Sequence, residues 1–222
     1  MQIAVIGRKT ISKAPERATV HLTIGCEADD PDTALQTATV TVNEIHDEIR
    51  QLRHDPERPT TWSAVLPIVT RSWRPWNRDG DIKPLRHSAT AKVKVKFRDF
   101  AALAEFLHTW GAHELVKVNG VEWTLTRDTR IRLREQVLTA AVTDAVYRAT
   151  VMAHAAGLTA VTMIDVADPG LLAGVPAGHD PFISASLGAV RGSLSGGGDQ
   201  PAELSPEKLE VAAEVHARFT AA

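Results

Sequence analysis

The chain has 222 residues, of which 44% are hydrophobic and 23% charged, and its formal net charge is −2. These values are ordinary for globular proteins, so the composition excludes wholesale disorder and fibrous repeats. The single cysteine, Cys26, excludes an intramolecular disulfide and a thiolate metal cluster.

Hydrophobic periodicity divides the first third of the chain into two strands and a helix. We predict a short strand at Ile3–Ile6 and a half-buried one at Ala18–Cys26, where every second residue is apolar and Gly25 can mark a bulge. A helix is predicted from Pro31 to Leu52, because acidic residues surround a proline at its start and apolar residues then recur every three or four positions.

A hairpin and a short helix are predicted next. An extended run covers 62–73, in which Pro67 favours an edge position or a bulge, and residues 74–81 read as a turn or long hairpin loop. The returning strand, Ala89–Phe97, alternates apolar residues with lysines. Asp99 can then cap a short helix.

The second half begins with a strand at 116–125, followed by a long helix from Asp128 or Thr129 to a glycine cap at Gly157. A strand is predicted at 161–166. Residues 170–181 and 193–206 read as loops, and the segment between them, Phe182 to Val190, as extended. A final alternating strand covers Leu209 to Phe219.

This order of elements, β-β-α-β-β-α-β-α-β-β-β, predicts an α+β fold. We expect largely antiparallel sheets with one long and two shorter helices packed on one face. The length suits a single domain over 1–222 or two interlocked α/β subdomains at about 1–110 and 111–222.

The start of the chain has no basic region followed by a long apolar run, so no signal peptide is visible. No stretch approaches the ~20 apolar residues of a spanning helix. We therefore expect a soluble cytoplasmic protein without a transmembrane segment.

Charge is concentrated between residues 71 and 98, where 9 basic and 2 acidic residues give a net charge of +7. The binding residues that this segment suggests are Trp73, Arg74, Trp76, Arg78, Arg86, Lys92, Lys94 and Lys96.

One interpretation of this segment is a basic surface with interleaved aromatics that docks an acidic protein or an anionic ligand. The other is a solvated strand face whose lysines prevent edge pairing, with the tryptophans packed at the hairpin base or a subunit interface. The sequence pI of about 6.5 argues against a nucleic-acid partner.

Catalytic and metal-binding signals are weak. The 9 histidines show no metal-ligand spacing, so the sequence predicts no metal and no cofactor. A hydrolase set of His179, Asp180, Ser184 and Ser186 can be drawn, but no nucleophile-elbow motif supports it.

The order of several segments resembles a known family. These segments are Ile3–Gly7, Ala14-Pro15-Glu16 before the strand Ala18–Ile24, the Ala-rich helix 31–52, the strands 62–69 and 89–97, the helix 134–157 and Leu204–Val211. Over about residues 2–219 the chain resembles the SIMPL domain family of bacterial proteins, long catalogued as a domain of unknown function. The resemblance implies no catalytic residues and a role in envelope, stress or signalling contexts through assembly and partner binding.

We therefore expect a non-catalytic assembly and interaction protein that forms a homo-oligomer, rather than an enzyme. The long strands leave sheet edges that need partners, and Trp73 and Trp76 add apolar area in a loop region. The alternatives are a module that binds an anion or small ligand through 71–98, and an uncharacterised hydrolase.

Overall fold

A computed structural model describes residues 1–76, 82–172 and 204–222 and divides them into two compact units. Unit 1 contains residues 1–15, 125–172 and 207–222, and unit 2 contains residues 16–76, 82–124 and 204–206. Unit 1 is therefore assembled from both ends of the chain and a central segment.

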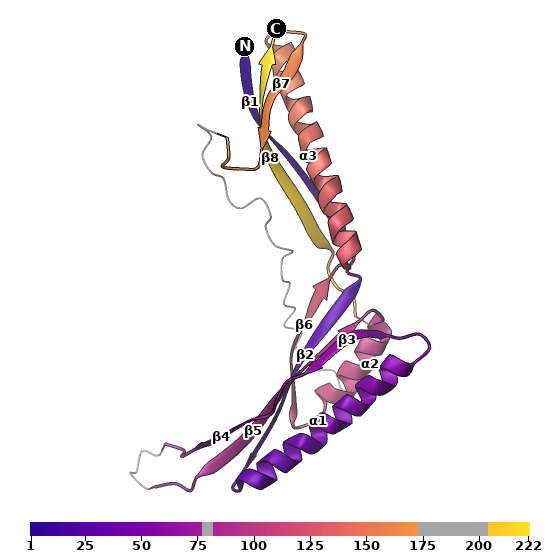
Figure 1. The fold of residues 1–222 in the computed structure, drawn as a ribbon, viewed down its shortest axis with the longest axis vertical. Helices are drawn as coiled ribbons and strands as arrows, with labels where there is room; N and C mark the ends of the chain where they lie inside the picture. Colours follow the sequence, from indigo (N-terminus) through magenta and orange to yellow (C-terminus); the bar gives the residue numbers. More distant parts are fainter. Residues whose placement is uncertain (77–81, 173–203) are drawn as a thin grey trace. The chain divides into compact units, whose positions relative to one another are not determined.

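Unit 1 is a three-stranded antiparallel sheet with one long helix on it (Figure 1). The strand order is β1 (Gln2–Lys13), β8 (Leu209–Ala221) and β7 (Val161–Ala167), and the helix is α3 (Arg127–Ala155). The first and last strands pair over their whole length, from Gln2 opposite Thr220 to Lys13 opposite Leu209.

Small residues let α3 approach the sheet of unit 1 closely. Four alanines at intervals of four residues are fully buried on the inner side of the helix: Ala141, Ala145, Ala149 and Ala153. A Cβ atom added to Gly7 of β1 would lie only 2.0 Å from the backbone oxygen of Ala141. The strand and helix backbones therefore pack together at a point where only glycine fits.

Unit 2 is a larger antiparallel sheet with two helices on one side of it (Figure 1). Its strands are β2 (Arg17–Ala28), β3 (Thr60–Val65), β4 (Val69–Trp73), β5 (Arg86–Phe97) and β6 (Val116–Thr124). They follow the order β3-β5-β2-β6, and β4 extends the pairing along β5. The helices are α1 (Pro31–His54) and α2 (Phe100–Gly111).

The core of unit 2 lies between its sheet and its helices. The inward residues of β2 and β5 pack against apolar residues of α1 and α2, such as Ile45 and Phe106. Each helix begins where an aspartate caps it: Asp30 accepts from the backbone of Thr33, and Asp99 from those of Ala101 and Ala102. On the other face of the sheet, the outward residues of β2 and β5 are mostly polar, such as Thr23 and Lys92.

These observations confirm the α+β fold, the antiparallel sheets and the placement of helices on one sheet face within each unit. Three details of the sequence prediction differ. The run 62–73 forms two strands on either side of Pro67, because proline lacks the N–H that a continuous ladder needs. The bulge lies where β2 pairs with β6, between His21 and Leu22, rather than at Gly25.

The third difference is the length of the first strand, which continues past Gly7 to Lys13. The extended segment predicted at 182–190 lies outside the described residues. Among the helices that the structure does describe, none is long and apolar enough to cross a membrane.

Candidate functional site

The outer face of the unit 2 sheet carries a row of lysines. On β5, Val93 and Val95 are fully buried against the helices, so the alternating Lys92, Lys94 and Lys96 point to the opposite side. Their neighbours on β2 and β6 add His21 opposite Lys94 and Lys117 opposite Thr23. We call Lys92, Lys94, Lys96, His21 and Lys117 the basic sheet face.

Little acidic charge compensates the basic sheet face. Within the described residues, no ion pair joins Lys92, Lys94 or Lys96 to a carboxylate. Glu122 lies 3.6 Å from the imidazole of His21, and the Nζ of Lys96 lies 6.0 Å from the ring centre of Trp62. The lysine row therefore keeps its positive charge available to a partner.

The remaining residues of the predicted site lie further along the same hairpin. Trp73 is half-buried at the end of β4, opposite Arg86, whose guanidinium pairs with Asp29. Trp76 is 82% exposed. Arg78 lies outside the described residues.

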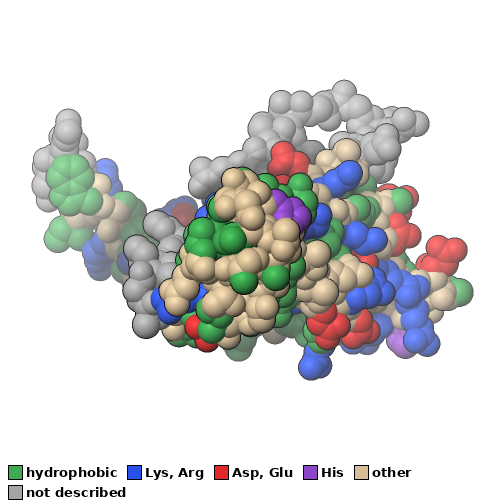
Figure 2. Space-filling view, turned by 90° about the horizontal axis from the view of Figure 1, so that it is seen from above, with side chains coloured by type: hydrophobic (Ala, Val, Ile, Leu, Met, Phe, Trp, Pro, Cys, Tyr) green, Lys and Arg blue, Asp and Glu red, His purple; other side chains and the backbone are tan. Residues whose placement is uncertain are grey.

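The structure thus separates the predicted site into the basic sheet face and a hairpin end. Arg74 marks that end, where its guanidinium donates a hydrogen bond of 2.9 Å to the carbonyl of Lys83. Hydrophobic and basic side chains lie together there, beside the grey atoms at the far left of Figure 2.

Unit 2 also has an acidic helix face. Glu44, Asp47, Glu48, Gln51 and Asp55 line a shallow groove of about 620 Å³ along α1, and we call these residues the acidic strip. Desolvation raises the pKa of Glu48, which accepts a hydrogen bond of 2.7 Å from the indole of Trp110 that lowers it in part. Asp47 pairs with Arg50 at 3.3 Å, and among the described residues no ion pair involves Glu44, Glu48 or Asp55.

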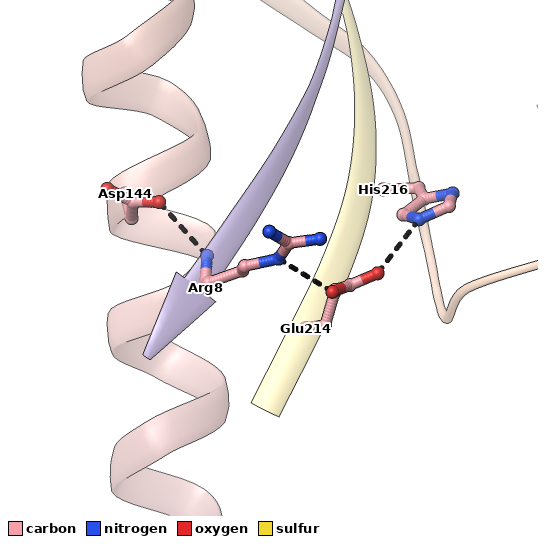
Figure 3. Close-up of polar contacts among 4 residues, drawn as sticks. All are labelled: Arg8, Asp144, Glu214 and His216. Carbon is pink, nitrogen blue, oxygen red and sulfur yellow. Dashed lines mark hydrogen bonds and ion pairs between the residues drawn. The ribbon is translucent and has the colours of Figure 1, made fainter. Parts of the chain in front are cut away.

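Unit 1 contains a polar network that joins the edge strand β1 and the central strand β8 to α3 (Figure 3). The Nε of Arg8 on β1 lies 2.7 Å from the carboxylate of Glu214 on β8, and the backbone N–H of Arg8 donates to Asp144 of α3 at 3.0 Å. The other Glu214 oxygen lies 3.3 Å from Nε2 of the buried His216. Because Asp144 occupies an outward N–H of β1, the network also obstructs pairing along that edge.

Desolvation alone would raise the pKa of Glu214, but its hydrogen bonds from Arg8 and His216 outweigh that effect, and the net pKa is lowered. Glu214 is therefore ionised at neutral pH and serves as the acceptor of the network. The Nδ1 atom of His216 has no hydrogen-bond partner in the described part of the chain. We assign the network a structural role, because it links three elements of unit 1.

A family model described as SIMPL, a protein of unknown function (DUF541), matches residues 3–219. The chain belongs to the SIMPL family. A search of curated proteins found no significant match.

The described residues of this SIMPL protein contain no group of three or more His, Cys, Asp or Glu side chains placed to hold a metal ion. The hydrolase set of His179, Asp180, Ser184 and Ser186 lies outside the described residues.

Sequence reasoning found the lysine row of this SIMPL protein from its alternation alone. It did not find the acidic strip, because acidic residues on the outer side of a helix read as an ordinary solvated face. The signal that places them on one strip is their spacing of four residues along the helix. It separates Glu44 from Glu48, and it recurs through Asp47, Gln51 and Asp55.

Proposed function

We propose that this SIMPL protein is non-catalytic and acts by self-association, with the basic sheet face of one copy docking against the acidic strip of another. The observation that carries the proposal is the presence, on opposite sides of unit 2, of a row of carboxylates and a lysine row for which the described residues provide no ion pair. Complementary charges of this kind guide association and select the partner.

The spacing of the two rows supports the proposal. Alternate residues of a strand lie about 6.7 Å apart, so Lys92, Lys94 and Lys96 span about 13 Å. Residues four apart on a helix are separated by about 6 Å, so the acidic strip from Glu44 to Asp55 spans about 16 Å. The two rows can therefore oppose each other over several charges at once.

Apolar residues beside each row can add contact area. Trp62, 47% exposed, lies next to Lys96 on the basic sheet face, and the half-buried Leu52 lines the groove of the acidic strip. Exposed ion pairs alone contribute at most about 1 kcal/mol each, so we expect a reversible, salt-sensitive assembly. Because the two surfaces differ, each copy can bind two others, and the product is a ring or a chain.

The contact between Lys96 and Trp62 favours a second candidate function, in which the same face binds a small anion. A lysine held over an indole ring is oriented, and the two further lysines of the row can share one anionic group. In that case the positive charge of the basic sheet face binds a ligand and does not contribute to self-association.

The test reverses the charge of the lysine row. We expect the wild type to be oligomeric by light scattering at low salt and to dissociate as salt is added. Lys92→Glu/Lys94→Glu/Lys96→Glu should be a folded monomer, whereas Lys9→Glu/Lys13→Glu, which also adds negative charge but on β1 of unit 1, should remain oligomeric.

A wild type that is monomeric at micromolar concentration and low salt would contradict the proposal. So would an oligomer whose mass the triple variant leaves unchanged. A monomeric wild type that binds inorganic phosphate, with the binding lost in the triple variant, would instead support the second candidate.

A further inference from the structure

The end of the β4–β5 hairpin exposes large apolar side chains. We call its described residues, 74–76 and 82–85, the hairpin tip. Trp76 is 82% exposed and Ile82 is 85% exposed, and Leu85 is also exposed. Scattered apolar residues are normal on a surface, but here a tryptophan and an isoleucine are both almost fully exposed on the two arms of one hairpin.

The two arms of the hairpin are joined just before these exposed apolar residues. The last paired residues of the ladder are Trp73 and Arg86, and Trp73 is half-buried there. Beyond them, the guanidinium of Arg74 donates to the carbonyl of Lys83 and ties one arm to the other. Because the two arms are held together at this point, Trp76 and Ile82 lose less conformational entropy when they bind a partner.

Basic residues flank these apolar side chains. Arg71, Arg74, Lys83 and Arg86 lie on the two arms, and the segment 71–86 holds 5 basic and 2 acidic residues, a net charge of +3. Arg86 is partly neutralised by Asp29, whereas the described residues give Lys83 and Arg71 no ion pair.

We infer that the hairpin tip docks on an anionic lipid surface, with Trp76 and Ile82 entering the interface and the basic residues contacting the phosphates. An indole has an apolar body and an N–H donor, and tryptophan concentrates at the boundary between water and hydrocarbon. Each lysine or arginine near an anionic membrane strengthens attachment by about fivefold. The hairpin tip therefore has apolar side chains that suit the membrane interface and basic side chains that suit its anionic phosphates.

A lipid surface fits the hairpin tip better than a protein partner does. A stable protein interface buries at least about 1,000 Å² with close complementarity, whereas the tip offers three apolar side chains on two narrow arms. A bilayer accommodates such an end without a matching pocket. This inference uses residues outside the basic sheet face, so it is independent of the proposed self-association.

The test measures co-sedimentation of the full chain with two kinds of vesicle. One kind is phosphatidylcholine alone, and in the other a quarter of the lipid is phosphatidylglycerol. We expect the wild type to bind the anionic vesicles, to bind the neutral ones much more weakly, and to be released by salt. Trp76→Ser/Ile82→Ser should lower the partition coefficient at least tenfold. Val69→Ser/Tyr147→Ser removes apolar residues that are each 66% exposed elsewhere and should bind as the wild type does.

A second pair of variants shows which basic residues contribute to membrane binding. Arg74→Gln/Lys83→Gln should weaken binding to anionic vesicles, and Lys92→Gln/Lys94→Gln/Lys96→Gln should not, whatever the latter does to the oligomeric state. The inference is overturned if the wild type ignores anionic vesicles, or if the lysine-row variant loses binding while the tip variants keep it. It is also overturned if Trp76→Ser/Ile82→Ser changes the oligomer mass and leaves vesicle binding intact, because the tip would then contact protein.

Discussion

Gly7 shows how a single residue positions a helix. The sequence predicted a short strand at Ile3–Ile6, which leaves Gly7 outside it. In the structure Gly7 is a buried residue in the middle of β1, and it faces Ala141 and Ala145 of α3. Periodicity alone could not reveal this contact, because the helix that requires it begins more than a hundred residues later.

Gly7→Ala should destabilise the protein by about 1–3 kcal/mol or more. The added Cβ would lie 2.0 Å from the Ala141 oxygen and 2.8 Å from Ala145, so α3 has to move away from the sheet. Thermal denaturation measures the loss. Gly25→Ala is the matched control, since nothing lies within 4 Å of its added Cβ, and a Gly7→Ala protein that melts like this control would refute the packing described.

The charge of Glu214 should make unit 1 less stable in acid. The pKa of this carboxyl is lowered in the folded state, so its contribution is present above the unfolded pKa and is lost as the pH falls through the folded value. Glu214→Gln should therefore cost about 1 kcal/mol at pH 7, because the partner Arg8 is largely exposed, and much less near pH 3. Chemical denaturation at both pH values is the measurement, and an equal loss at each would contradict this account.

Among the elements, β5 is the one whose two faces are most sharply divided. Its alternation of apolar residues and lysines predicted both the strand and its inner face, and the structure confirms both. The elements around it were harder to predict. The run 62–73 lacks such alternation, so its division into β3 and β4 depended on the backbone chemistry of one proline.

Val93→Asp should abolish cooperative folding of unit 2. Val93 is fully buried at the centre of the core, and no described residue there offers a compensating charge. Lys92→Asp introduces the same side chain on the exposed face of the same strand and should leave the protein folded. Circular dichroism during heating distinguishes them, and a soluble Val93→Asp protein with a sharp transition would show that the strand's inner face is wrongly assigned.

For the whole molecule, the pairing of the chain ends decides how the sequence is divided. β1 and β8 pair along their full length, so the first and last residues belong to one unit and a continuous middle segment forms most of the other. Local patterns identify the strands but carry no information about which distant strands meet, since both ends show only the same alternation.

For the same reason, the candidate site could be predicted from the sequence only in part. Alternation along β5 was enough to place three lysines on one face, and composition was enough to mark 71–98 as basic. Neither could show that the hairpin tip lies apart from that face, or that α1 carries a matching acidic strip. Both facts depend on how elements distant in the sequence pack together, and the pattern of neighbouring residues does not predict that packing.

The most direct test of self-association combines two variants that each lack one surface. Lys92→Gln/Lys94→Gln/Lys96→Gln neutralises the basic sheet face, and Glu44→Gln/Asp47→Asn/Asp55→Asn neutralises the acidic strip without touching Glu48, which binds Trp110. Light scattering after size exclusion should show each variant alone as a monomer. The mixture should form a heterodimer and nothing larger, because only one intact surface of each kind remains. A mixture that stays monomeric, or a single variant that still forms the wild-type oligomer, would contradict the account.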